Sequence, residues 1–372
     1  MAYLICGLVA QPTGFWENII FGFSNSIGNY AVAIILLTIC IKLVMLPIDY
    51  FNRRSSTKMQ EVQNKLAPKM AEIKKRYPDP QTQNQKMNEL YQKEGFNPMG
   101  SCLTMLVVMV LSMVVFFTLF GSLNNMAAYK ITNQYEQLQR AYVQEYIINQ
   151  EGITKEEFNN LEFKDGKIGE YNVGDCIITI STSQLTYQSG DNSGEKYVDV
   201  ANESVKQKYE QVKESFLWIK NVWIADSPLA KEIPDFNTYV TTAKITFNGD
   251  EESVLAKQQY DAVMLSLQNN AGVNGYFLLA ILTGVTAFLY QYLLTKKKKQ
   301  KENFYTKNAE QNPAANSGKA MLIILPIIMV VFTLSYNSIF ALYIIASQLV
   351  GMATAPLINK LLNIKFKREQ KK

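Results

Sequence analysis

The stretch Tyr30-Ala-Val-Ala-Ile-Ile-Leu-Leu-Thr-Ile-Cys-Ile-Lys-Leu-Val-Met-Leu-Pro-Ile48 is apolar except for a single charge, Lys42. It is long enough to cross a bilayer, because about 20 helical residues span a hydrocarbon core of about 30 Å. An ammonium group inside such a span costs roughly 2.5–3.5 kcal/mol on insertion scales. Two interpretations stay open. Lys42 lies in a polar cavity within the membrane, or its long side chain snorkels toward Asp49, about 10 Å further along a helix.

The neighbours of Lys42 extend this prediction along the helix. Thr38 lies one turn earlier on the same face, so we expect it to share the environment of Lys42. Leu36 is two positions from Thr38 and is expected to face lipid or packed helices.

Uncharged runs longer than about 18 residues, the length typical of a membrane span, occur four times. They are Asn18–Ile41, Gly95–Tyr129, Ala262–Thr295 and Ala320–Asn359. Ser335-Tyr-Asn-Ser338 interrupts the last run, which predicts two helices joined by a tight turn and hence five spans.

The fold class predicted is an all-α polytopic membrane protein. It has a five-span helical core, a cytoplasmic helical hairpin and an extracytoplasmic α+β insert. The predicted spans are 30–48, 98–120, 275–295, 319–335 and 338–358. The segments between and around them are 1–29, 51–96 (the hairpin), 121–274 (the insert), 296–318 (a basic loop) and 359–372 (a basic tail).

Charge predicts the orientation of these spans. Residues 51–96 carry ten Lys/Arg against five Asp/Glu, residues 296–319 seven against two, and residues 360–372 six against one. Residues 121–275 carry thirteen against twenty-two. Five alternating spans place the three basic segments on one side. The positive-inside rule then predicts an outer N-terminus and a cytoplasmic C-terminus.

The hairpin is predicted from an apolar stripe at steps of three and four residues. The stripe consists of Met59, Val62, Leu66, Met70, Ile73 and Tyr77, and continues in Met87 and Leu90 on the second helix. Asp79 is the expected N-cap of the second helix, with Pro80 at its first position and Gly95 at its end. Pro47 is expected to close the first span and Pro68 to kink the hairpin.

The two outer segments differ in how clearly their sequences indicate structure. Residues 14–28 are rich in aromatics and predict an interfacial helix. In the insert we expect helices at 126–148, 202–214 and 251–269. Strand-like pieces include Cys176–Ser181, Gln184–Tyr187 and residues 238–248.

Composition excludes several classes of site. The chain has no histidine, and its four cysteines are at 6, 40, 102 and 176, which excludes a histidine triad, a zinc cluster and a disulfide framework. We therefore expect no catalytic residues, no metal, no cofactor, no small-molecule substrate and no enzymatic activity. The N-terminus lacks a basic region and does not predict a typical cleavable signal peptide.

Two features have two interpretations each. Met105, Met109 and Met113 share a helix face, which indicates either ordinary packing or an adaptable apolar sliding surface. Lys296–Lys299 and the tail from Lys365 are topology anchors that meet anionic lipid, or they contact ribosomal RNA through its phosphates.

The order of five short motifs resembles the YidC/Oxa/Alb family of membrane protein insertases. The motifs are Ile41-Lys-Leu-Val-Met-Leu-Pro47, Lys58-Met-Gln-Glu-Val-Gln-Asn-Lys-Leu66, Asn97-Pro-Met-Gly-Ser-Cys-Leu103, Phe216-Leu-Trp-Ile219 and Leu282-Thr-Gly-Val-Thr286. Each is weak alone, but together they are specific. The resemblance covers about residues 14–120 and 215–365.

The resemblance implies five spans around a hydrophilic groove that is open to the cytoplasm and lipid and carries one positive charge at Lys42. We assign the groove to Lys42, Thr38, Thr286, Gln291 and Gln348. A greasy slide for the apolar segment of the substrate is assigned to Phe277, Met105, Met109 and Ile344. The cytoplasmic hairpin is assigned Met59, Leu66, Met70 and Met87. Nascent membrane proteins, the Sec translocon, the ribosome and anionic lipids are the implied partners.

The chain departs from the family pattern at several positions. Lys42 stands where arginine is usual, and Ile344 where an aromatic is frequent. Ser101, Thr104, Val108 and Val110 replace a Gly, Pro, Gln and Pro pattern, so one groove wall is less polar. These departures concern substrate range rather than fold.

Two other functions remain as alternatives. One is a channel or transporter for anionic solutes, and the other is a receptor or assembly factor acting through its extracytoplasmic domain. Deleting residues 130–210 would separate an insertase, which keeps its core activity, from a receptor, which loses it.

Overall fold

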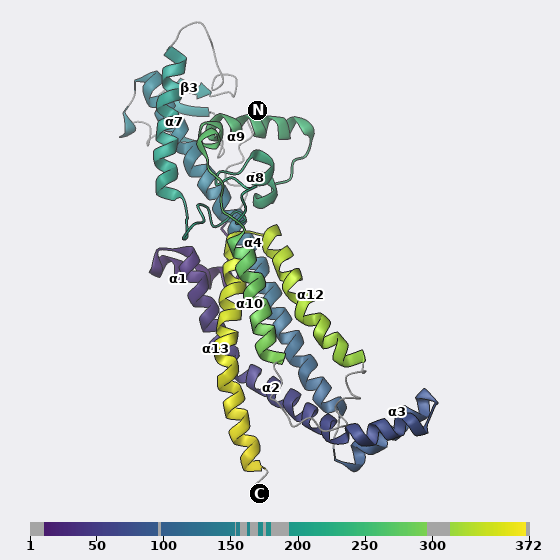
Figure 1. Cartoon of the computed structure of the whole chain (residues 1–372). Helices are drawn as coiled ribbons and strands as arrows, with labels where there is room; N and C mark the ends of the chain where they lie inside the picture. The colour runs from purple at the N-terminus through teal and green to yellow at the C-terminus, as the bar shows by residue number, and fades with distance from the viewer. Residues whose placement is uncertain are drawn as a thin grey trace. The chain divides into compact units, whose positions relative to one another are not determined.

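The computed structural model describes residues 11–95, 98–152, 154–156, 162–163, 170–173, 176–179, 193–295 and 313–369. Most of them are helical (Figure 1). The helices are α1 Phe15–Ile27, α2 Tyr30–Arg76, α3 Pro80–Lys93, α4 Pro98–Glu151, α7 Ser193–Val212, α8 Phe236–Ala243, α9 Asp250–Asn270, α10 Leu278–Thr295, α12 Pro313–Ser335 and α13 Ser338–Glu369. The strands are β1 Glu162–Phe163, β2 Glu170–Val173 and β3 Cys176–Thr179. The predicted helical membrane class is confirmed at this level.

Three helical stretches in the described residues are long and apolar enough to cross a membrane. They are Tyr30–Lys58, Leu106–Tyr146 and Ser338–Ile364. Leu278–Leu294 and Ile323–Ser335 are shorter apolar stretches. Each of the five lies over one predicted span, while a core of five spans stays a prediction. The predicted turn before the last helix is confirmed, because α12 ends at Ser335 and the Asn337 side chain accepts a hydrogen bond from the Phe340 amide at 3.0 Å.

Helix α2 differs from the sequence prediction because it continues through Pro47 and Pro68 to Arg76. The first span and the first hairpin helix are therefore one element. A proline inside a helix removes one backbone hydrogen bond and costs about 3 kcal/mol or more. Helix α2 nevertheless continues through both prolines.

The helical hairpin agrees with its prediction. Asp79 caps α3 by accepting a hydrogen bond from the Thr82 amide at 2.8 Å, and Pro80 opens the helix. Gly95 follows the helix with a φ of 64°, a conformation that favours glycine. The small hydrophobic core of the hairpin consists of Leu66 and Tyr91 packed with Val62, Met70 and Leu90.

Helix α4 also joins two predicted elements into one. A span at 98–120 and a helix at 126–148 were expected, and α4 runs unbroken from Pro98 to Glu151 (Figure 1). The intervening segment contains Gly121 and no proline. One glycine in a helix costs about 1 kcal/mol relative to alanine, which is too little to end it when both sides are packed.

The insert combines a small sheet with helices. Strands β1, β2 and β3 form an antiparallel sheet in that order, with Tyr171 opposite Ile178 in the β2–β3 register. Helices α7 and α9 contact each other. Three tyrosine rings from distant segments form the aromatic core, with Tyr135 centred 5.2 Å from Tyr239 and 5.0 Å from Tyr260.

The strand predicted at 238–248 is wrong, because residues 236–243 form α8. Phe236, Tyr239 and Ala243 are the buried residues of this helix, and their spacing follows the helical period rather than alternation. Asp235 caps the helix by accepting from the Thr238 amide at 2.8 Å. The β-branched residues between these positions produced the mistaken strand.

Several predicted features lie outside the described residues. They are the strand piece Gln184–Tyr187, the lysine run Lys296–Lys299, the last three residues of the basic tail and residues 1–10.

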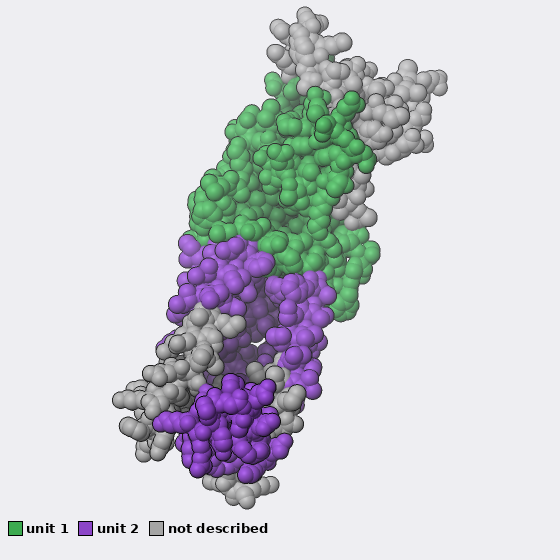
Figure 2. Space-filling model, turned by 90° about the vertical axis from the view of Figure 1, so that its right-hand side faces the viewer, with its two compact units in different colours: residues 1–34, 120–279, 333–341 green, residues 35–119, 280–332, 342–372 purple. Residues whose placement is uncertain are grey.

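The chain divides into two compact units (Figure 2). Unit 1 comprises residues 1–34, 120–279 and 333–341, and is coloured green. Unit 2 comprises residues 35–119, 280–332 and 342–372, and is coloured purple. Unit 1 holds most of the insert. Unit 2 holds the hairpin, Lys42 and most of the apolar helices.

Candidate functional site

Helix α2 carries Lys42 in unit 2, where its side chain is half-buried. Thr38, one turn earlier, is only 1% exposed, whereas Leu36 is 41% exposed. The two residues therefore lie on different faces of α2. Thr38 is more deeply buried than the half-buried Lys42, and a shared environment of the two residues stays a prediction.

A second polar contact joins α10 to α13 inside unit 2. The Thr286 hydroxyl donates a short hydrogen bond to the Gln348 side-chain oxygen, and both residues are buried. Thr286 is also within hydrogen-bonding distance of the Leu282 carbonyl, at 2.7 Å. The structure thus brings together two of the predicted groove residues. Gln291 is half-buried and lies five residues after Thr286, so it points to a different face of α10.

Thr283 belongs with this contact and was not selected from the sequence. It is fully buried one turn before Thr286, and its hydroxyl has no hydrogen-bond partner in the described part of the chain. The spacing of three residues between the two threonines could have identified it, because such residues share a helix face. A buried polar group without a hydrogen-bond partner lowers the stability of the fold. The core next to Thr286 therefore contains a hydroxyl group whose hydrogen-bonding capacity is not used.

The proposed greasy residues are not equivalent in the structure. Met109 on α4 is 55% exposed and its neighbours from Leu106 to Val114 are also largely exposed, with Val108 the buried exception. Ile344 is buried in α13 and offers no exposed sliding surface, contrary to the prediction, because its branched side chain fills the helix packing. Phe277 belongs to unit 1 and has a left-handed φ of 60°. The side chains of Met105 and Met59 are outside the described set.

The hairpin residues of the prediction lie as follows. Leu66 is in the hairpin core, and Met70 lies beside it with its sulfur 3.6 Å from the Tyr91 hydroxyl. Met87 is half-buried on α3. Glu94 forms ion pairs with Lys65 at 3.2 Å and Lys69 at 3.0 Å, and these contacts lower the pKa of its carboxyl group.

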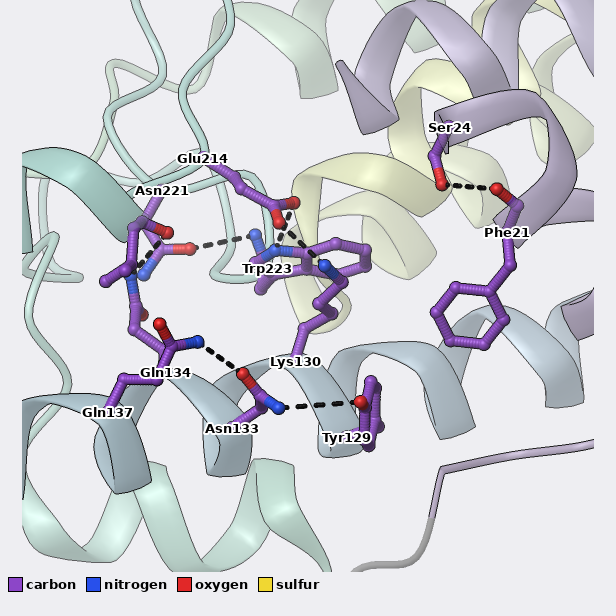
Figure 3. A network of polar contacts seen from close by, with 11 residues as sticks. Phe21, Ser24, Tyr129, Lys130, Asn133, Gln134, Gln137, Glu214, Asn221 and Trp223 are labelled. Carbon is purple, nitrogen blue, oxygen red and sulfur yellow. Dashed lines mark hydrogen bonds and ion pairs between the residues drawn. The ribbon is translucent and has the colours of Figure 1, made fainter. Parts of the chain in front are cut away.

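Unit 1 contains a polar network that the sequence did not indicate (Figure 3). Lys130 on α4 pairs with Glu214 at 3.0 Å, and the Trp223 indole donates to the same carboxylate at 2.9 Å. The Lys130 ammonium also lies 3.8 Å from the centre of the Tyr30 ring, a cation–π geometry. Burial raises the pKa of Glu214, and the positive charge of Lys130 opposes that rise. The network ties the start of α2 to α4 and to the loop after α7.

Asp226 is another residue that the sequence analysis missed. Its carboxylate accepts from the amides of Tyr276 at 2.8 Å and Leu279 at 2.6 Å, where α10 begins. Negative charge at a helix N-terminus is stabilising. The signal available in the sequence was a single acidic residue in the apolar stretch from Val222 to Ala230.

The insert also has an acidic cavity of about 270 Å³ between α7 and α9. Three of the carboxylates that line it already have ammonium partners within the chain. Glu203 pairs with Lys206, Glu210 with Lys213 and Glu232 with Lys220. Because these carboxylates are paired with lysines of the same chain, we interpret them as surface ion pairs rather than as a binding site of a receptor.

Parts of this chain are similar to known proteins. The family model described as 60Kd inner membrane protein matches residues 22–193. A membrane protein insertase YidC of Thioalkalivibrio sulfidiphilus is 40% identical over 121 residues, which are 32% of this chain and 20% of that protein. The YidC of Geobacter sulfurreducens is 40% identical over 102 residues, 27% of this chain and 18% of that protein.

A third relative, the YidC of Campylobacter jejuni, is 39% identical over 100 residues, 27% of this chain and 17% of that protein. The matched region thus spans about a fifth of the length of these curated relatives. Over these parts the chain is therefore similar to membrane protein insertases named YidC, and its motifs around Lys42 and Thr286 resemble those of the YidC/Oxa/Alb family.

Proposed function

We propose that this protein is a membrane protein insertase that also helps its substrates fold, acting through a hydrophilic groove at Lys42. The observation that supports this most is the half-buried ammonium group of Lys42 in the apolar span Tyr30–Lys58. A charge at that depth is stable when water or polar groups solvate it. Thr38, Thr286 and Gln348 are buried polar residues of apolar helices, and we propose that they contribute to the polar lining of the groove.

In this mechanism the groove shortens the apolar barrier that a polar tail must cross. A fixed cation attracts an acidic tail, and the attraction strengthens where the local dielectric constant is low. The apolar segment of the substrate meanwhile contacts exposed apolar side chains such as Met109, Val110 and Val114 on α4. Methionine suits this contact because its side chain is unbranched and adaptable.

The proposed topology has five spans, with the N-terminus and the α+β insert outside and the hairpin, basic loop and basic tail in the cytoplasm. The charge difference between these segments supports it through the positive-inside rule. Nascent membrane proteins are the proposed substrates. The Sec translocon, the ribosome and anionic lipids are proposed partners. The amphipathic hairpin gives a nascent chain or the ribosome a surface to contact.

The experiment that tests this proposal is reconstitution into liposomes with one single-span substrate that has an acidic outer tail. We expect insertion by the wild type and by Lys42→Arg, and reduced insertion by Lys42→Ala. A substrate with a neutral tail should be affected less by Lys42→Ala. Equal insertion of the acidic-tailed substrate by wild type and Lys42→Ala would contradict the electrostatic role of Lys42.

A deletion that leaves the neighbouring helices intact tests the receptor alternative, and anion flux tests the channel alternative. Residues 152–192 are replaced by a flexible linker, which retains α4, α7 and the Lys130–Glu214 pair. An insertase should keep its core activity in this variant, whereas a receptor acting through the insert should lose it. Anion flux through empty liposomes without substrate insertion would instead favour a channel or transporter.

A further inference from the structure

Arg53 is a charged residue of α2 that contacts two other helices within unit 2. Its Nη1 donates to the Ala355 carbonyl oxygen at 3.3 Å and to the Asn359 side-chain oxygen at 3.3 Å, both on α13. The Tyr290 hydroxyl on α10 also hydrogen-bonds with the Arg53 side chain. One guanidinium therefore joins three helices that are far apart in the sequence.

Gly351 allows Tyr290 to lie against α13. A Cβ atom at position 351 would lie 2.7 Å from Cε2 and 2.9 Å from Cζ of the Tyr290 ring. Real Cβ atoms do not approach a ring so closely, so any larger residue would force the ring to move. Gly351 is one turn before Ala355, and the tyrosine ring and the guanidinium thus occupy consecutive turns of α13.

The same face of α13 carries the Thr286–Gln348 contact. Gln348 is three residues before Gly351, and Thr286 is four residues before Tyr290. One polar contact, Thr286 to Gln348, and one ring contact, Tyr290 against Gly351, therefore hold α10 to α13, and Arg53 lies at the second of them. Pro356 removes a backbone hydrogen bond from this part of α13, so the side-chain contacts lie where the helix itself is weaker.

Arg53 also has a defined relation to Lys42. It is eleven residues later, about 16 Å along the helix and close to three full turns, so both residues are on nearly the same face of α2. On this face of α2, Arg53 is hydrogen-bonded to α13, and Lys42 lies about three turns before that contact. Asp49 lies between them and interacts electrostatically with both cations.

We propose that Arg53 is a positioning residue that fastens α2 to α10 and α13 and thereby sets the width of the groove at Lys42. This inference rests on the proposed insertase function. Arginine suits the position because its planar fork holds five N–H donors in a fixed geometry, whereas lysine has a single ammonium on a flexible stem. We assign Arg53 no contact with the substrate, since its Nη1 atom donates to α13.

The test measures the distance between α2 and α13 in the full chain in lipid nanodiscs. Spin labels at the exposed positions Lys58 and Lys360 report the distance distribution by pulsed electron resonance. The wild type should give a narrow distribution. Arg53→Gln and Gly351→Ala should each broaden it and shift it, while Arg53→Lys should restore it in part. Arg76→Gln, at an exposed arginine of the same helix, is the matched control, and it should leave the distribution narrow.

Insertion by the same variants in liposomes gives the functional measurement. Arg53→Gln should reduce insertion roughly threefold or more, with partial recovery in Arg53→Lys. Asn359→Ala provides a second test if Arg53→Gln fails to fold, because it removes one acceptor and no charge, and it should broaden the distribution less. An unchanged distribution in Arg53→Gln or in Asn359→Ala would overturn the positioning role even if insertion occurs. A wild type that inserts nothing would instead contradict the proposed function and leave the distance result intact.

Discussion

The two halves of α4 are one continuous helix in two different environments. From Leu106 to Val114 the apolar side chains are largely exposed, whereas Leu123, Met126 and Ile131 are 1–3% exposed. The first stretch is in unit 2 and the second in unit 1. The type of apolar residue does not separate them, since leucine and methionine occur in both stretches. The first stretch therefore requires lipid or an apolar substrate segment around it. The apolar residues of the second stretch are already covered by other parts of the protein.

Polar residues follow the same division. In unit 1 they form connected contacts, such as those of Lys130, Glu214 and Trp223. Unit 2 also has polar contacts, such as Thr286 to Gln348, but Lys42 and Thr283 lie as single polar residues in its apolar helices. A polar group in low dielectric has a large effect on function or stability, because few other groups solvate it.

The largest effect on this comparison is expected from the same substitution in each half of α4. Leu123→Ala should lower the free energy of unfolding by about 2–5 kcal/mol, because it leaves a cavity in a packed core. Leu106→Ala, at a 49% exposed leucine, should change it by no more than about 0.5 kcal/mol. Reversible unfolding in detergent, followed by tryptophan fluorescence, measures both. Equal losses would mean that the two halves do not differ in packing.

The sequence predicted a helix in each half, at 98–120 and 126–148, but not their continuity. Periodicity and hydropathy locate an apolar helix, and they located the hairpin caps at Asp79 and Gly95. They do not show whether a glycine such as Gly121 ends a helix, since packing from distant segments decides that. The mistaken strand at 238–248 has the same cause. Phe236 and Tyr239 pack on tyrosines that the sequence does not place nearby.

The site was partly predictable for a similar reason. Lys42 and the Thr286–Gln348 pair stood out as polar residues in apolar spans. Arg53 did not, because arginines at a predicted span end are ordinary topology markers. Its partners Tyr290 and Ala355 are known only from the three-dimensional fold. The burial of Ile344 likewise depends on which helices surround α13.

A smaller effect is expected for the ion pair of unit 1. Lys130→Met should destabilise the protein by about 2 kcal/mol, because it leaves the largely buried Glu214 without its cation. The matched control is Lys206→Met, whose surface pair with Glu203 is mostly exposed and worth at most about 1 kcal/mol. Thermal unfolding of both variants at neutral pH gives the comparison. Equal destabilisation by Lys130→Met and Lys206→Met would mean that the Lys130–Glu214 pair contributes no more to stability than an exposed ion pair.

The raised pKa of Glu214 adds a pH dependence. A raised pKa means that the folded state binds the proton more tightly than the unfolded state. The contribution to stability is therefore present below the ordinary value of 4.5 and is lost as pH rises through the folded value. Glu214→Gln should remove this slope. A slope unchanged in Glu214→Gln would assign it to another group.

The smallest effect is expected at Asp226. Asp226→Asn keeps the size of the side chain and loses its charge at the start of α10, which should cost about 1 kcal/mol. Asp226→Ala should cost more, because the amides of Tyr276 and Leu279 would then lose their acceptor. Thermal unfolding of the two variants measures the difference. Identical stability of Asp226→Ala and wild type would show that water replaces the carboxylate without loss.

The central claim is that Lys42 lies in a water-filled groove while the opposite face of α2 meets lipid. Single cysteines at positions 42 and 44, in a background without native cysteines, test it with a membrane-permeant thiol reagent that reacts only in water. Val44 is the matched control, because it is 77% exposed yet lies on the other side of the helix. We predict fast reaction at position 42 and slow reaction at position 44, with no labelling at position 42 by an impermeant reagent added outside. Equally slow reaction at both positions would contradict the account, because no aqueous groove would then surround Lys42.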